Sequence, residues 1–156
     1  MIFLLRIASL IFFLVGFSSP TNEKKSHLIG TVPVDSLFNH DVIFYNEYKN
    51  YLVDDKINLS EVNDVEVVIM FGTWCHDSKR EVPRMIRILE SIGTSFESIS
   101  LIALDMNKNE PESKAKLFNL ERTPTFIFFK NGDEIGRIVE RPKVSLESDL
   151  KEIYKN

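Results

Sequence analysis

The chain has 156 residues, of which 44% are hydrophobic, and twelve are phenylalanine. This length is enough for one compact domain with a core and short for two, and the hydrophobic content argues against a disordered chain. The formal net charge of −4 argues against the basic surface that nucleic-acid binding requires.

The N-terminus is strongly apolar. The first seventeen residues are apolar apart from Arg6 and Ser9, and a polar stretch follows them. The uninterrupted apolar run, 7–17, is shorter than the roughly 20 residues needed to span a bilayer. Gly16 and Ser18 provide the small residues of a signal-peptide cleavage site. These features predict a secretory signal.

We therefore expect residues 1–18 to be a cleaved signal peptide, with an uncleaved membrane anchor through residues 2–17 as the alternative. Residues 19–30 are polar and mixed, and we expect them to link the signal to a single domain over residues 31–156. The expected location is the periplasm or the outside of the cell.

The first half of the domain alternates helical and strand patterns. Residues 36–55 place apolar side chains at roughly helical intervals and predict one helix. The β-branched apolar run 65–71 predicts a buried strand. A long amphipathic helix is then predicted, closed by Gly93, because apolar residues recur at helical spacing at Val82, Met85, Ile86, Leu89 and Ile92.

The second half predicts a strand within 98–107 and a short helix over 112–120. Two further strands, 125–129 and 134–140, are joined through Asn-Gly and predict a β-hairpin. Residues 145–154 begin with a serine cap and acidic residues and predict a closing helix. This order predicts an α/β fold with a central mixed β-sheet and helices on both faces.

The only cysteine, Cys75, follows the first strand and begins the long helix. A lone cysteine is most often an inert buried residue, but in an exported protein it indicates a reactive thiol or an intermolecular partner. At a helix start, unpaired N–H groups and the helix dipole favour the thiolate. Ser78 can donate to the sulfur and Lys79 can add positive potential, whereas the acidic Asp77 opposes the thiolate.

Motifs around this cysteine resemble the thioredoxin-like family. The sequence WCHDS (74–78) stands where the family has Trp-Cys-x-x-Cys, and Pro83 matches the proline of the active-site helix. Thr123-Pro124 matches the cis-proline that faces the active-site sulfur, and KNGDEIGRI matches the following hairpin. The resemblance covers residues 60–154 and implies the three-layer thioredoxin-like fold.

The resemblance implies a catalytic position at Cys75, with Ser78 beside it, and substrate contacts at Trp74, His76, Arg122, Thr123 and Pro124. Two departures from the family pattern matter. Ser78 replaces the second cysteine, and Ile69 stands where many members carry a buried acid. An intramolecular dithiol cycle therefore cannot run.

Several polar residues near the cysteine also have simpler interpretations. His76 can stabilise a thiolate, but solvation is the commoner role for such a residue. Adjacent ligands on one turn rarely converge on an ion, so we expect no metal site and no cofactor. The basic stripe of Arg80, Arg84 and Arg87 is interpreted as a solvated face paired with acids rather than an anion-binding patch.

The leading hypothesis is an exported single-cysteine thioredoxin-like protein. It would take part in thiol–disulfide exchange of the isomerase or mixed-disulfide type, with a protein or low-molecular-weight thiol or disulfide as partner. The first alternative is a non-catalytic module that holds extended peptides. The second is a peroxide-reactive thiol that passes through sulfenic acid.

Overall fold

The structure is a computed structural model that describes residues 26–59, 62 and 65–155. The expected signal peptide, 1–18, and the linker as far as residue 25 lie outside these residues. Within the described ranges, no helix has the length and apolar character needed to cross a membrane.

A five-stranded mixed sheet forms the centre of the molecule, in the order β1-β3-β2-β4-β5. β2 pairs with β3 in parallel, and every other neighbouring pair is antiparallel, which confirms the mixed sheet. The bounds of the strands are Gly30–Thr31 (β1), Glu66–Phe71 (β2), Ile99–Ala103 (β3), Thr125–Lys130 (β4) and Asp133–Val139 (β5).

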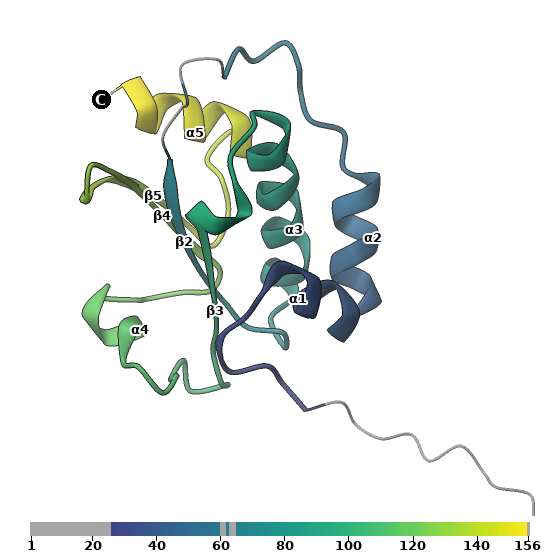
Figure 1. The fold of residues 1–156 in the computed structure, drawn as a ribbon, viewed down its shortest axis with the longest axis vertical. Helices are drawn as coiled ribbons and strands as arrows, with labels where there is room; N and C mark the ends of the chain where they lie inside the picture. Colours follow the sequence, from purple (N-terminus) through teal and green to yellow (C-terminus); the bar gives the residue numbers. More distant parts are fainter. Residues whose placement is uncertain (1–25, 60–61, 63–64, 156) are drawn as a thin grey trace, which may run out of the picture.

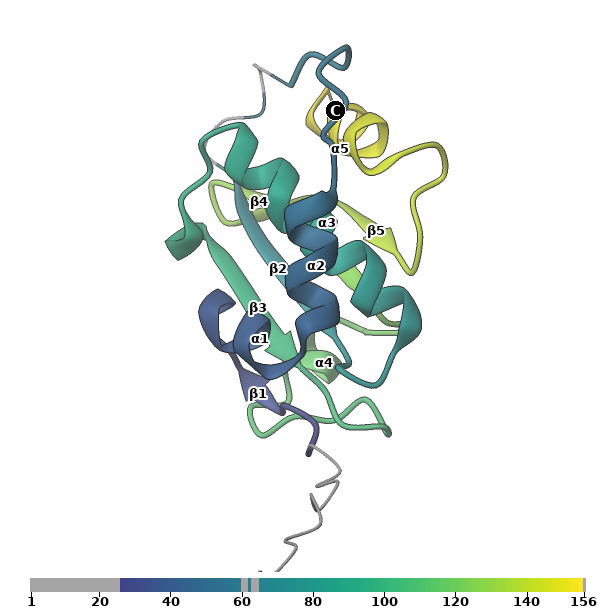
Figure 2. The same cartoon turned by 90° about the vertical axis from the view of Figure 1, so that its right-hand side faces the viewer.

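Helices cover the two faces of the sheet unequally. Four helices lie over one face, and α4 (Lys114–Leu117) lies over the other, as Figures 1 and 2 show. The four are α1 (Val34–His40), α2 (Val42–Asn50), α3 (His76–Ser91) and α5 (Leu146–Lys155), and a short 3₁₀ turn spans Phe96–Ser98. The prediction of helices on both faces is confirmed.

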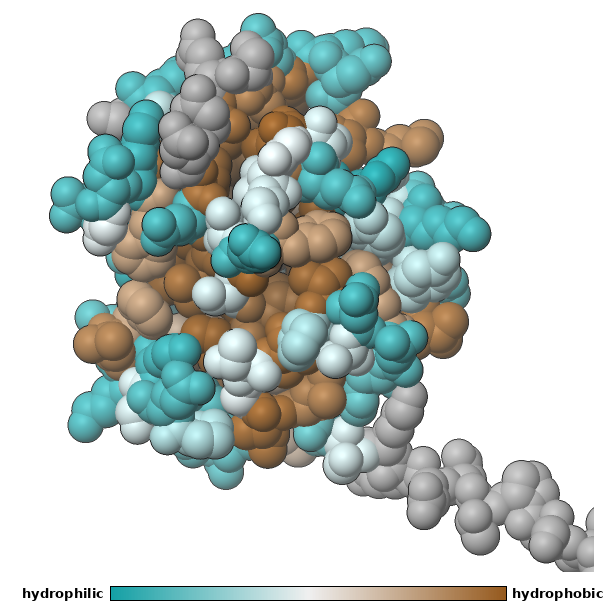
Figure 3. Space-filling model, in the orientation of Figure 1, coloured by the Kyte–Doolittle hydropathy of each residue, from teal (hydrophilic) through white to brown (hydrophobic). Residues whose placement is uncertain are grey.

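The alternation of side chains along β2 produces two cores. Ile69 and Phe71 point into the larger core, where Phe71 meets Phe44 of α2 edge to face at 6.0 Å between ring centroids. Met70 points into the smaller core under α4. In the space-filling view, hydrophobic residues gather toward the middle of the face and hydrophilic residues toward its periphery (Figure 3).

The prediction of a single helix over 36–55 is wrong. Asp41 has an extended backbone (φ −142°, ψ 116°), and its carboxylate accepts a hydrogen bond from the Ile43 N–H at 3.0 Å. Asp41 therefore ends α1 and caps α2. The backbone becomes extended again at Tyr51, so α2 ends at Asn50.

The other predicted elements form, with shifted ends. Gly93 (φ +79°) closes α3: its N–H donates to the Glu90 carbonyl, and the Thr94 N–H donates to the Leu89 carbonyl. The predicted strand over 98–107 ends early, because Asp105 accepts hydrogen bonds from two backbone N–H groups of the following turn.

At the C-terminal end, Asn131 and Gly132 both have positive φ, as a two-residue hairpin turn requires. Ser145 accepts a hydrogen bond from the Ser148 N–H at 3.1 Å and so caps α5, as predicted. The predicted helix over 112–120 is shorter in the structure, where α4 ends at Leu117.

Candidate active site

Cys75 lies where the buried strand β2 gives way to α3. Its backbone is extended, and it occupies the N-cap position, one residue before the first helical turn. The Cys75 N–H donates to the Gly72 carbonyl at 3.0 Å, and its carbonyl accepts from the Lys79 N–H at 3.1 Å. Cys75 is half-buried, so an incoming group can reach the thiol, and its side chain makes no capping hydrogen bond to the N–H groups of α3.

The turn that carries Cys75 is held by Trp74. The indole Nε1 donates to the Leu104 carbonyl at 3.0 Å, which ties the turn to the end of β3. The ring covers Gly72 closely, because a Cβ atom there would lie 2.5 Å from Cε2 of the indole. Trp74, predicted to contact substrate, therefore also has a clear structural role.

The loop before β4, which is distant in the sequence, contacts the sulfur of Cys75. The Thr123–Pro124 peptide bond is cis. The Cys75 thiol donates to the Thr123 carbonyl oxygen, with 3.3 Å between Sγ and O. Both loop residues are buried. The structure thus brings together Cys75, Thr123 and Pro124, which the sequence had assigned to one site.

Ser78 is fully buried on the first turn of α3. Its Oγ accepts a hydrogen bond from the Gly72 N–H at 3.2 Å. That bond gives Ser78 a structural role in holding the end of β2 on α3. The expected hydrogen bond from Ser78 to the sulfur stays a prediction.

The Lys79 side chain reaches the junction of α1 and α2, where its Nζ lies 2.9 Å from Oδ2 of Asp41. Burial acts to raise the pKa of Asp41. Hydrogen bonds from the Lys79 side chain and the Ile43 N–H outweigh that effect, so the pKa lies below its ordinary value. The positive charge expected to support a thiolate is therefore largely used by Asp41.

The residues next to the cysteine differ in exposure. The His76 side chain is 86% exposed, in keeping with a solvated residue. Asp77 faces inward and holds two arginines, Arg80 at 3.2 Å and Arg141 at 3.0 Å. Sequence reasoning missed Arg141, because it lies 64 residues away and follows the hairpin with no motif around it.

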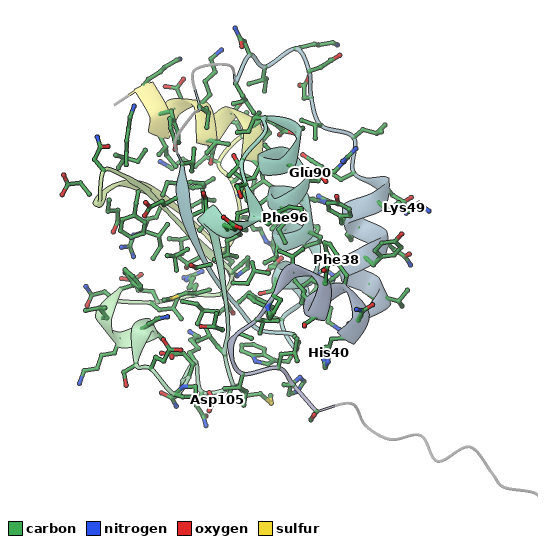
Figure 4. All side chains as sticks on the ribbon, in the orientation of Figure 1. Phe38, His40, Lys49, Glu90, Phe96 and Asp105 are labelled. Atoms are coloured by element: carbon green, nitrogen blue, oxygen red, sulfur yellow. The ribbon has the colours of Figure 1, made fainter. Side chains whose placement is uncertain are left out.

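Three further arginines in the described part of the chain are also paired. Arg122 binds Glu140 at 2.6 Å, and Arg84 of the basic stripe binds Glu47 at 3.0 Å. Arg87 binds Glu90, which lies between α3 and α2 (Figure 4). A hydrogen bond from Tyr48, opposed by burial and aided by Arg87, lowers the pKa of Glu90. This pairing supports the interpretation of the stripe as a solvated face.

A hollow of about 910 Å³ adjoins the site on the side of α1 and α2. His27 borders it, and its Nδ1 lies 3.1 Å from the Thr73 hydroxyl, so the segment before β1 contacts the turn that carries Cys75. No sequence pattern had indicated a role for His27 at this site. Across the described ranges, no three His, Cys, Asp or Glu side chains are grouped to hold a metal ion.

Comparisons with known proteins agree with this geometry. The sequence model of the thioredoxin family matches residues 46–152. A thioredoxin-like protein of Acanthamoeba polyphaga mimivirus is 28% identical over 112 residues, which cover 72% of this chain and 74% of that protein. The mitochondrial Thioredoxin-3 of Saccharomyces cerevisiae is 26% identical over 96 residues, which cover 62% of this chain and 71% of the yeast protein.

Among solved structures, a protein of unknown function from Pseudomonas aeruginosa superposes with a TM-score of 0.56. The match covers 80% of this chain and 90% of that one at 12% identity, so the likeness concerns the fold alone. The sheet, the Trp-Cys turn at a helix start and the facing proline loop define a protein of thioredoxin-like fold. The chain belongs to the thioredoxin family, as a member with the single cysteine Cys75.

Proposed function

We propose that this chain takes part in thiol–disulfide exchange by forming a mixed disulfide at Cys75. The observation that carries the proposal is the position of the thiol. It is half-buried at the start of the 16-residue helix α3 and 3.3 Å from the Thr123 carbonyl. The thiolate is the attacking form in such exchange, and a helix start is a common setting for reactive cysteines.

The exchange conserves electrons. The Cys75 thiolate attacks one sulfur of a partner disulfide, the partner S–S bond breaks, and a new bond forms to Sγ. The other partner sulfur leaves as a thiolate with the electron pair of the broken bond. Because the chain has one cysteine, a thiol from outside must resolve the adduct. This chemistry suits isomerisation or transfer of an adduct. The protein would then act as a one-cysteine thiol–disulfide oxidoreductase or isomerase.

The test is to incubate the protein with bis(2-hydroxyethyl) disulfide at neutral pH and measure its intact mass. We expect one adduct, reversed by dithiothreitol, and no adduct on the matched Cys75→Ser variant. An unchanged mass for the folded wild-type protein would overturn the proposal.

A peptide-binding module is the second candidate, and one contact favours it. The thiol donates a hydrogen bond to the Thr123 carbonyl, so Cys75 also helps to hold the loop that faces it, as a structural residue would. In this case Cys75→Ser would keep both the capture of a partner and the cellular phenotype. Loss of capture in Cys75→Ser would favour exchange.

We also propose that the protein is exported to the periplasm or outside the cell. The support is the apolar N-terminal run with small residues near position 18. Intact mass of the protein isolated from its own cells tests this, because cleavage removes residues 1–18. A full-length protein in the membrane fraction would instead support an uncleaved anchor, and a full-length protein in the cytoplasm would overturn export.

A further inference from the structure

Two arginines are joined to the segments that border Cys75. Arg122 immediately precedes Thr123, whose carbonyl oxygen is 3.3 Å from Sγ. Arg141 is bound to Asp77, two residues beyond Cys75, with its Nε 3.0 Å from Oδ1 and its Nη2 3.2 Å from Oδ2. Each guanidinium is therefore joined to a segment that borders the thiol.

The two ion pairs present their positive ends to solvent. The Arg141 side chain is 61% exposed while its partner Asp77 is 13% exposed. Arg122 is 64% exposed and its partner Glu140 is 36% exposed. The charges of each pair largely offset one another, but the arginine is the more exposed partner in both pairs. An approaching molecule therefore meets the guanidinium groups first.

Both arginines retain hydrogen-bond donors. A guanidinium has five N–H donors in a planar fork that matches a carboxylate. Within the described part of the chain, Arg122 uses its Nη1 and Arg141 uses its Nε and Nη2 in hydrogen bonds to protein. The hydrogen bond to Glu140 raises the pKa of Arg122, and the one to Asp77 raises that of Arg141, so both stay charged.

A tight turn places these groups. Glu140 has a left-handed backbone (φ +65°), and the Arg141 N–H donates to the Val139 carbonyl at 2.7 Å, which closes a three-residue turn. The Glu140 N–H donates to the Pro124 carbonyl at 2.7 Å. Positive φ is unfavourable for glutamate, and such strained residues cluster at functional sites. The turn thus holds Glu140 and Arg141 beside the loop that carries Pro124.

We propose that Arg122 and Arg141 select disulfides that carry carboxylates as the substrates of Cys75. This inference rests on the proposed exchange function and names its substrate class. The carboxylates belong either to a small acid disulfide or to acidic residues beside a cystine in a partner protein. In both cases the arginines bind the carboxylates while the Cys75 thiolate attacks the disulfide, and the departing thiolate carries away one acid group.

The first test compares three small disulfides that differ in charge: 3,3′-dithiodipropionate, bis(2-hydroxyethyl) disulfide and cystamine. The rate of adduct formation at Cys75 is measured by intact mass at low salt. One unpaired unit charge about 6 Å away in water changes a rate by about threefold, so about tenfold is the upper limit for two arginines. The acids paired with them reduce this, and we expect the diacid to react several-fold faster than the neutral disulfide. Cystamine should react slowest.

Salt provides a check on the unaltered protein. Raising the ionic strength to about 1 M shortens the screening length to about 3 Å and should bring the three rates together. A diacid preference that persists in 1 M salt would overturn the electrostatic selection.

Variants then locate the charges. In R122Q/R141Q the ratio of diacid to neutral rate should fall several-fold, whereas R122K/R141K should keep most of it. The matched control, K130Q/K155Q, also removes two positive charges, but at the end of the molecule away from Cys75. Lys130 ends β4, beside the start of β2, and its Nζ lies 6.0 Å from the ring centroid of Tyr154. Tyr154 and Lys155 are neighbours in the last turn of α5. The ratio of diacid to neutral rate in K130Q/K155Q should equal that of the wild type.

Two short cystine peptides, flanked by Glu or by Gln, distinguish the sources. Faster reaction of the Glu peptide supports a protein partner, and equal peptide rates with a diacid preference support a small acid disulfide. Equal rates for the three small disulfides at low salt would overturn the selection and leave exchange intact. An absence of adduct with all three, the neutral one included, would overturn exchange itself.

Discussion

Replacing Ser78 by alanine tests whether this residue stabilises the fold or acts on the sulfur. The hydroxyl oxygen is buried and accepts the Gly72 N–H at 3.2 Å, and Gly72 is itself buried at the end of β2. Alanine removes the acceptor and leaves a buried backbone N–H without it. The resemblance to the family had instead placed Ser78 beside the catalytic cysteine.

The expected cost follows from that one hydrogen bond. A buried N–H that loses its partner destabilises a protein by about 1–3 kcal/mol. Alanine is the better helix former and returns about 0.5 kcal/mol on α3. We therefore expect the free energy of unfolding of Ser78→Ala to fall by about 1–2 kcal/mol. For a domain of this size the melting temperature should fall by about 3–8 °C.

The assay is urea unfolding followed by circular dichroism, together with the rate at which iodoacetamide alkylates Cys75 in the folded protein. Ser91→Ala is the matched control, because Ser91 lies on the exposed last turn of the same helix and should change the unfolding free energy by less than about 0.5 kcal/mol. Unchanged stability of Ser78→Ala with a several-fold slower alkylation would refute the structural role. It would show that Ser78 acts on the sulfur.

Two further substitutions test local features of the fold. Asp41→Asn keeps an acceptor for the Ile43 N–H but removes the ion pair with Lys79. The pKa of Asp41 is lowered from its ordinary value of 3.8. The carboxylate therefore contributes fully to the stability of the fold at neutral pH, and this contribution is lost as the pH falls through the folded-state pKa. Urea unfolding should give a loss of about 0.5–1 kcal/mol at pH 7 that shrinks below about pH 4, and a pH-independent difference would contradict this. Gly93→Ala forces a Cβ into a left-handed position (φ +79°) and should cost about 1–2 kcal/mol in the same assay, whereas an unchanged midpoint would show that the end of α3 rearranges freely.

The sequence alone was enough to identify most elements of the sheet and its main helix. The β-branched run of β2, the helical spacing of apolar residues along α3 and the Asn-Gly hairpin are local patterns, and local patterns report backbone conformation and burial directly. The cysteine at a helix start and the proline loop were likewise found from short motifs. The one wrong helix, 36–55, failed where Asp41 caps a second helix within an apolar periodicity that continues across the break.

The charged surroundings of the sulfur were decided by the tertiary structure. Arg141 and Asp77 are 64 residues apart, and His27 and Thr73 are 46 apart. The sequence does not predict which arginine pairs with which acid, because the order of charges along a chain carries no periodicity that identifies a distant partner. Which ones meet depends on how the turn at Glu140 and the start of α3 are placed by the packed sheet between them. The sequence therefore determined that a thiol would stand at a helix start, and the fold determined which charges surround it.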